Sequence, residues 1–200
     1  MAIMSITSRK RAWDIGLSAI VMALGWLMQV ALVTRVPLNQ VLCNLPLAMT
    51  IVWGTTFGSP LGRLTSDQLR HLSITTVFVR QMLSGSVSGA MVGGFFGLLY
   101  AHILPVYPYS YPLIGWVAGY FCLRGINQAM FLTIPLVFLM TALSESLTAI
   151  QLHLIGRPDV LNHLAEFVFP EAGLNAVISP FLFFPMRAWA EYSTSILRQK

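Results

Sequence analysis

Glu145 is the only acidic residue deep within an apolar run of this sequence, and polar residues flank it at helical spacing. On an α-helix, Thr141, Ser144 and Thr148 lie within one turn of Glu145 on the same face. An ionisable group in a long apolar run is costly unless it faces protein or water. We consider a ligand cavity, a proton path and a structural hydrogen bond to a neighbouring helix through Asn175. The structural bond is the favoured interpretation.

Catalytic signatures are missing from the sequence, which contains no HExxH motif, P-loop or GxSxG motif. The nearest approach is the stretch SVSG at 86–89, which is similar to the GxSG motif of rhomboid proteases. Those proteins are six-span enzymes that use a serine and a histidine within the membrane. Here the first glycine of the motif is replaced by Ser86, and the last apolar run contains no histidine. Without a base the serine stays an unreactive alcohol, so we expect no enzyme activity.

The histidines and cysteines predict no metal site, cofactor or disulfide. His102, His153 and His163 are all expected near the outer face of the membrane, but no two of them have the spacing of ligands on one helix. Cys43 and Cys122 lie in apolar runs expected toward opposite faces, without a CxxC motif around either.

A row of glycines recurs every four residues in one apolar run. Such a row permits another helix backbone to approach closely. In lipid the hydrophobic effect does not drive helices together, so close packing and Cα hydrogen bonds stabilise the contact instead. We favour packing against a helix of the same chain, with an interface to a partner protein as the alternative. The row consists of Gly85, Gly89, Gly93 and Gly97, and a lesser pair in the next run consists of Gly115 and Gly119.

The composition predicts that these residues are positioned by membrane-spanning helices. Apolar residues make up 56% of the 200 residues and charged residues only 10%, and the mean hydropathy is +0.72. These values exclude an ordinary soluble domain. The pI near 9.6 does not indicate nucleic-acid binding, because the cationic residues are scattered between apolar runs and form no patch with aromatic residues.

Six apolar runs, of which the second and the fourth are short, predict six transmembrane helices in a single all-α polytopic membrane domain over 1–200. We expect a kink at Pro135. A polar loop is expected over 58–81, and an amphipathic segment is expected on the outer surface over 157–170. The predicted spans are 15–33, 41–57, 82–104, 111–125, 129–154 and 172–189.

The distribution of cationic residues predicts the orientation of these spans. Six spans place both termini on one side of the membrane, and cationic residues collect on the cytoplasmic side of short loops. With cytoplasmic termini, only Arg35 and Arg157 of the twelve Lys and Arg residues are outside.

Three stretches, taken in order, resemble the bacterial rod shape-determining protein MreD family. The first is GGFFGLLY at 93–100, and the second is YPLIGWVAGY at 111–120, in a span that ends at Arg124. The most specific is PEAGLNAVISP at 170–180 with FPMR at 184–187, which is similar to the closing helix of the family. The resemblance covers roughly 82–192.

The resemblance implies a non-enzymatic scaffold in the bacterial inner membrane. Members of the family bind the bitopic protein MreC and act with the actin-like MreB and with cell-wall synthases. The implied fold is similar to the six-helix substrate-binding subunits of energy-coupling-factor transporters. That similarity supplies the alternative, a vitamin-binding membrane subunit, which requires several polar groups that converge on one outward cavity.

Overall fold

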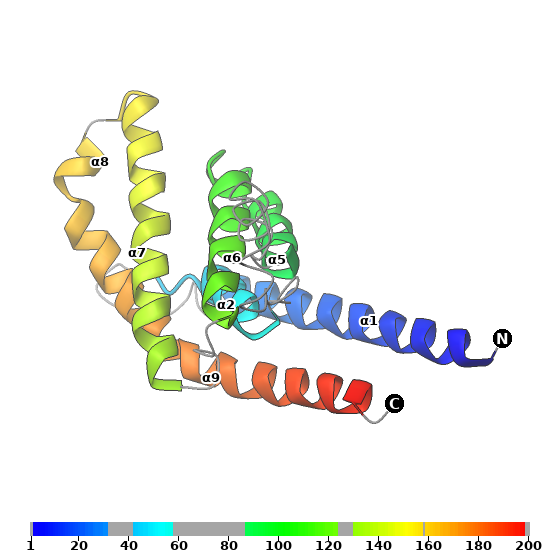
Figure 1. Ribbon diagram of the computed structural model, residues 1–200. Coiled ribbons are helices and arrows are strands. Elements are labelled where there is room, and N and C mark those ends of the chain that lie inside the picture. Colours follow the sequence, from blue (N-terminus) through cyan, green and yellow to red (C-terminus); the bar gives the residue numbers. More distant parts are fainter. Residues whose placement is uncertain (1, 32–41, 58–86, 124–129, 158, 199–200) are drawn as a thin grey trace, which may run out of the picture.

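The computed structural model describes residues 2–31, 42–57, 87–123, 130–157 and 159–198, and these residues form helices and no strands (Figure 1). The predicted polar loop at 58–81 lies outside the described residues. The helices are α1 (Ala2–Ala31), α2 (Leu45–Phe57), α5 (Val87–Leu99), α6 (Tyr107–Leu123), α7 (Met130–Leu154), α8 (Asp159–Asn162) and α9 (Leu164–Arg198).

Helix α1 begins well before the predicted start at residue 15. No proline interrupts its 30 residues, so the helix extends through the basic segment at 9–11. At 1.5 Å per residue it is about 45 Å long.

Helices α5 and α6 form an antiparallel hairpin that packs against α2 (Figure 1). The turn between them is short, and the backbone N–H groups of Tyr109 and Ser110 already donate to the carbonyl of Val106. Helix α6 therefore starts at Tyr107, four residues before the predicted span. Pro108 lies in the first turn of α6, where a helix needs no N–H donor, so it is compatible with this earlier start.

Helix α7 and the first part of α9 form a second antiparallel hairpin. Gly156, with a φ of 97°, adopts the left-handed conformation that commonly closes a helix. Helix α7 is continuous through Pro135. The predicted amphipathic segment at 157–170 and the predicted span at 172–189 share one helix, because α9 runs for 35 residues from Leu164.

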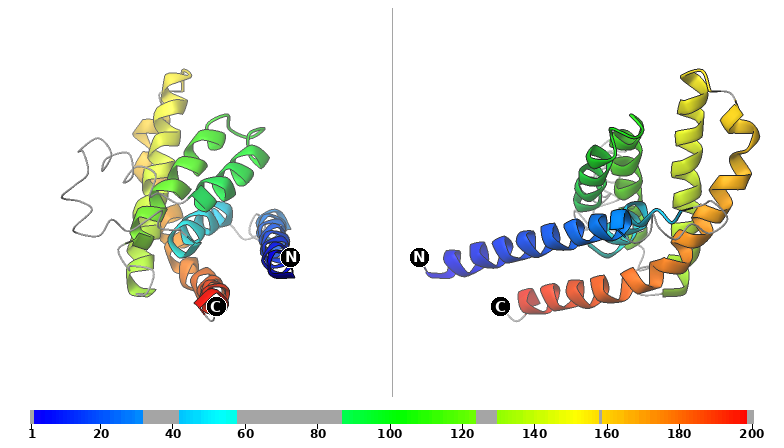
Figure 2. Two further views of the ribbon diagram at one scale, coloured as in Figure 1. Left: turned by 45° about the vertical axis from the view of Figure 1, so that its right-hand side comes forward. Right: turned by 180° about the vertical axis from the view of Figure 1, so that it is seen from behind.

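The helices do not form one parallel bundle. Helix α1 and the last part of α9 run across the direction of α5, α6 and α7, and the two chain ends lie on the same side of the molecule (Figures 1 and 2). Helix α9 changes direction along its length, and it contains Pro170, Pro180 and Pro185. Each proline removes a backbone hydrogen bond, which permits such a bend.

Two helices in the described part of the chain are long and apolar enough to cross a bilayer, through their segments Phe131–Leu154 and Leu164–Tyr192. The apolar segments Gly16–Ala31, Leu45–Phe57 and Val87–Leu99 are shorter.

Large apolar side chains cover the outside of the described helices. Leu98, Phe131 and Phe181 are 70%, 82% and 76% exposed. Polar side chains, including Thr50 and Asn175, are instead fully buried. This distribution suits a surface in contact with an apolar medium and an interior held by packing and hydrogen bonds.

Candidate functional site

The glycine row packs against a helix of the same chain. A Cβ atom at Gly93 would overlap the backbone carbonyl of Tyr111, and one at Gly97 would overlap the carbonyl of Tyr107. Each contact joins α5 to α6. Gly85 lies outside the described residues, and Gly119 is buried in α6.

Three glycines from three helices meet at the centre of this contact. A Cβ at Gly89 would overlap the carbonyl of Gly115 and would lie 2.8 Å from the Cα of Gly54 on α2. The described glycines of this contact, which we call the glycine seam, are Gly54, Gly89, Gly93, Gly97 and Gly115. Gly54 was not predicted, although a single glycine within an apolar helix is a signal for close backbone approach.

The polar stripe on α7 is mostly buried. Thr141, Ser144 and Thr148 are each at most 3% exposed, and the Thr148 hydroxyl donates to the carbonyl of Ser144 at 3.0 Å. The buried Oε1 atom of Glu145 has no hydrogen-bond partner. The expected structural bond between Glu145 and Asn175 is therefore wrong for this atom, and Asn175 is bonded elsewhere.

Asn175 ties α9 to two other parts of the fold. Its Oδ1 accepts hydrogen bonds from the backbone N–H of Asn44 at 2.8 Å and from the Cys43 thiol at 3.1 Å. Its Nδ2 donates to the Thr141 hydroxyl at 3.3 Å, one helical turn before Glu145. The side chain of Gln29 on α1 holds the same segment, because it donates to the Cys43 carbonyl and accepts from the backbone N–H of Leu45, both at 2.9 Å.

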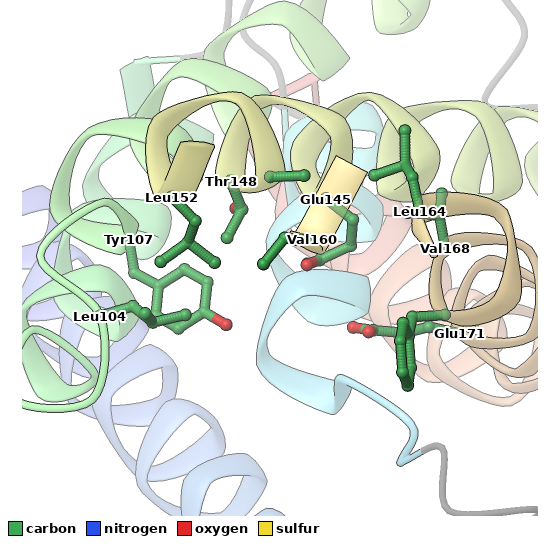
Figure 3. Close-up of a pocket in the computed structure, with 11 residues that line it drawn as sticks. Leu104, Tyr107, Glu145, Thr148, Leu152, Val160, Leu164, Val168 and Glu171 are labelled. Atoms are coloured by element: carbon green, nitrogen blue, oxygen red, sulfur yellow. The ribbon is translucent and has the colours of Figure 1, made fainter. Parts of the chain in front are cut away.

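Glu145 lines a cavity of about 180 Å³ between α7, α8 and the start of α9. A second carboxylate, Glu171 of α9, lines the same cavity, which we call the carboxylate cavity. Figure 3 shows the carboxyl groups of Glu145 and Glu171 and the hydroxyl of Tyr107 directed into one shared space. The rest of the lining is chiefly apolar, with Leu152 and Val168 among its members.

Glu171 is a functional candidate that the sequence reasoning missed. The residue falls at the expected boundary between a surface segment and a span, where an acid is ordinary. It lies four residues before Asn175, and on a helix this spacing places both side chains on one face. Both residues belong to α9, and this face of the helix is directed toward the interior, because Asn175 is fully buried and Glu171 lines the cavity.

A larger cavity of about 380 Å³ adjoins the carboxylate cavity and shares Tyr107 and Glu171 with it. Its other polar lining comes from Gln29, Asn44, Tyr100 and Tyr111. The Tyr111 hydroxyl donates to the Asn44 Oδ1 at 3.0 Å. The fold thus brings polar groups from α1, the start of α2, α6 and α9 to one region.

The third feature is an apolar groove of about 540 Å³ between α1, α2 and α9. Its lining is apolar along its whole extent, with large side chains such as Leu24, Met28, Phe181 and Trp189. On the α2 side the groove borders an aromatic cluster in which the rings of Trp53 and Trp189 meet edge to face at 5.4 Å.

The described residues offer little for catalysis or metal binding. They contain no group of three or more His, Cys, Asp and Glu residues able to hold a metal ion. The Ser88 hydroxyl donates to the carbonyl of Phe57 at 3.1 Å. His163 is exposed and contacts Glu166 on the surface.

Comparison of the chain with family models, curated proteins and solved structures finds no match.

Proposed function

We propose that this chain is a multi-pass inner-membrane scaffold of the bacterial cell-elongation machinery, similar to MreD. In this proposal the chain crosses the membrane six times with both termini in the cytoplasm. It binds the transmembrane helix of an MreC-like bitopic protein and, through that protein, cell-wall synthases and MreB. It carries out no reaction of its own.

The observation that carries the proposal is the apolar groove between α1 and α9. The exposed side chains on its two walls, such as Leu24 of α1 and Phe181 of α9, are those that a single apolar helix would cover. At Gly25 in the groove lining, the side chain of Met49 from α2 lies directly against the backbone of α1, which closes the floor of the groove. A helix bound there would gain packing contacts, which are the main source of helix association in lipid.

The resemblance to MreD supports the same proposal from a different direction. Its most specific stretch, at 170–180, contains Asn175, whose side chain joins α9 to the start of α2 and to α7. The bent helix that forms one wall of the groove is thus held by a residue from the most specific stretch of the resemblance.

Site-specific photo-crosslinking tests the groove directly. A photoreactive amino acid at Leu24 or Phe181 should crosslink to a co-expressed MreC-like protein in membranes. The same group at Met91, which is 71% exposed on α5 and away from the groove, is the matched control and should not. Depletion of the chain should also round the cells of its rod-shaped host. Crosslinks from Met91 alone, or no crosslinks together with normal cell shape, would refute the scaffold.

A second candidate function is supported by the polar lining of the two joined cavities. A vitamin-binding subunit of an energy-coupling-factor transporter requires convergent polar groups, and Gln29, Asn44, Tyr111 and Glu171 converge here. Native mass spectrometry of the purified chain distinguishes the two functions. A retained vitamin with normal cell shape after depletion would favour the transporter subunit over the scaffold.

A further inference from the structure

The carboxylate cavity contains two acids and no basic side chain among its described lining residues. Removing carboxylates from water is costly unless each is paired or hydrogen-bonded. The Oε1 atom of Glu145 is buried and has neither an ion-pair nor a hydrogen-bond partner. The carboxyl group of Glu145, which points into the cavity (Figure 3), therefore has an acceptor atom without a donor.

We propose that the carboxylate cavity binds a small organic cation, an ammonium group attached to an apolar body, with the ammonium between Glu145 and Glu171. This site goes beyond the proposed scaffold function and does not depend on it. It involves the first part of α9, whereas the apolar groove involves the residues from Ile178 onward.

The chemistry of the lining selects this class of ligand. An ammonium carries three N–H donors, so it can donate hydrogen bonds to the carboxylates of Glu145 and Glu171 together. The ring of Tyr107 adds an aromatic surface, which attracts cations. Leu152, Val168 and the other apolar side chains suit the hydrocarbon part of a ligand.

The same lining disfavours a hydrated metal ion. Divalent cations require several oxygen ligands, usually six or more for calcium. The cavity supplies two carboxylates in an otherwise mainly apolar wall. Its volume of about 180 Å³ is far above the roughly 15 Å³ that admits one water molecule, so a small molecule has room.

The position of the cavity indicates the side from which a ligand enters. Its lining combines Leu104 of the turn before α6, Leu152 near the end of α7 and Val160 of α8. In the proposed topology these are the outer ends of the helices, so the ligand reaches the site from outside the cell.

Thermal unfolding of the detergent-purified full-length chain tests the site with phenethylammonium as the probe. At saturation the probe should raise the unfolding temperature by about 5 °C. The uncharged analogue 2-phenylethanol should not. Because this comparison uses the unmodified chain, it remains decisive even where a variant folds poorly.

Two variants and one control locate the effect. Glu145→Gln and Glu171→Gln keep the shape of each side chain but remove its charge, and each should weaken phenethylammonium binding at least about tenfold. Glu166→Gln removes an exposed carboxylate on the same helix and should bind the probe like the unmodified chain.

Four results would overturn the proposal. They are equal stabilisation by phenethylammonium and 2-phenylethanol, no stabilisation of the unmodified chain, and unchanged probe binding by both glutamine variants. The fourth is stabilisation by sodium or calcium ions but not by phenethylammonium, which would assign the cavity to an inorganic cation. None of these results depends on crosslinking in the groove. The proposed scaffold function and the proposed cation site can therefore be refuted independently of each other.

Discussion

At the scale of single residues, Asn175 joins three parts of the fold: α9, the segment before α2 and α7. Its amide is fully buried and exchanges hydrogen bonds with the segment before α2 and with α7. The Cys43 thiol, the backbone N–H of Asn44 and the Thr141 hydroxyl would each lose a partner if it were truncated. Such groups cost free energy when they are left unsatisfied, because no water replaces the lost partner.

Asn175→Ala should therefore destabilise the fold by about 2 kcal/mol. We expect a lower unfolding temperature in detergent and a lower amount of protein in the membrane. The matched control is Asn162→Ala, which truncates an exposed asparagine on α8 and should leave both values unchanged. Equal effects of the two substitutions would show that the Asn175 hydrogen bonds contribute nothing specific.

The candidate site was partly predictable at this scale. The sequence singled out Glu145 because an acid in a long apolar run stands out, and it placed Thr141, Ser144 and Thr148 on the same face. The partner of Asn175 and the role of Glu171 were not predictable, because both depend on how α9 turns against α7. Hydropathy places Glu171 at a boundary, whereas the structure places it in the cavity lining.

At the scale of the elements, the glycine seam determines how closely α2, α5 and α6 approach. Gly93 and Gly94 are neighbours on α5 but differ in their surroundings. A Cβ at Gly93 would overlap the backbone of Tyr111, whereas one at Gly94 would meet only the Cγ of Pro112, at an ordinary 3.8 Å. The backbone of α6 cannot move aside as a flexible side chain can, so the first contact cannot relax locally.

Gly93→Ala should destabilise the α5–α6 hairpin by about 2 kcal/mol, the cost of an overpacked contact. Gly94→Ala should be neutral or slightly stabilising, because alanine is the better helix former. The amount of folded protein, measured by fluorescence-detected size-exclusion chromatography, distinguishes the two variants. Equal amounts would contradict the internal packing described here.

The helices themselves were largely predictable, but their ends were not. Helix α7 matches its predicted span to within one residue, because both its ends coincide with a change in hydropathy. Helices α1 and α9 extend beyond the predicted spans. Hydropathy identifies only the apolar part of a helix, so it gives no sign that a helix continues through polar residues such as Glu166. The glycine row was visible as a period of four, although its partner on α6 was not.

At the scale of the whole molecule, the turns provide a test of orientation. The turn after α5 and the turn after α7 lie on the same side of the molecule (Figures 1 and 2). The positive-inside rule predicts that both of these turns are outside the cell, because ten of the twelve Lys and Arg residues would then be cytoplasmic.

Cysteine labelling in spheroplasts tests this orientation. In a background with Cys43→Ala and Cys122→Ala, cysteine at exposed position His102 should react with an impermeant maleimide. Cysteine at exposed position Glu191, expected on the cytoplasmic side, should react only after the membrane is permeabilised. The reverse pattern would invert the proposed topology.

The contact between Asn175 and Asn44 also has a consequence for the order in which the chain is synthesised. The two residues are 131 positions apart, so at ribosomal rates Asn175 emerges roughly ten seconds after Asn44. Gln29 is only 14 positions before Cys43 and precedes it in translation. The nascent chain can therefore hold this segment through Gln29 first and complete its hydrogen bonds when α9 arrives, so a ribosome that stalls before α9 leaves an early segment open to membrane proteases.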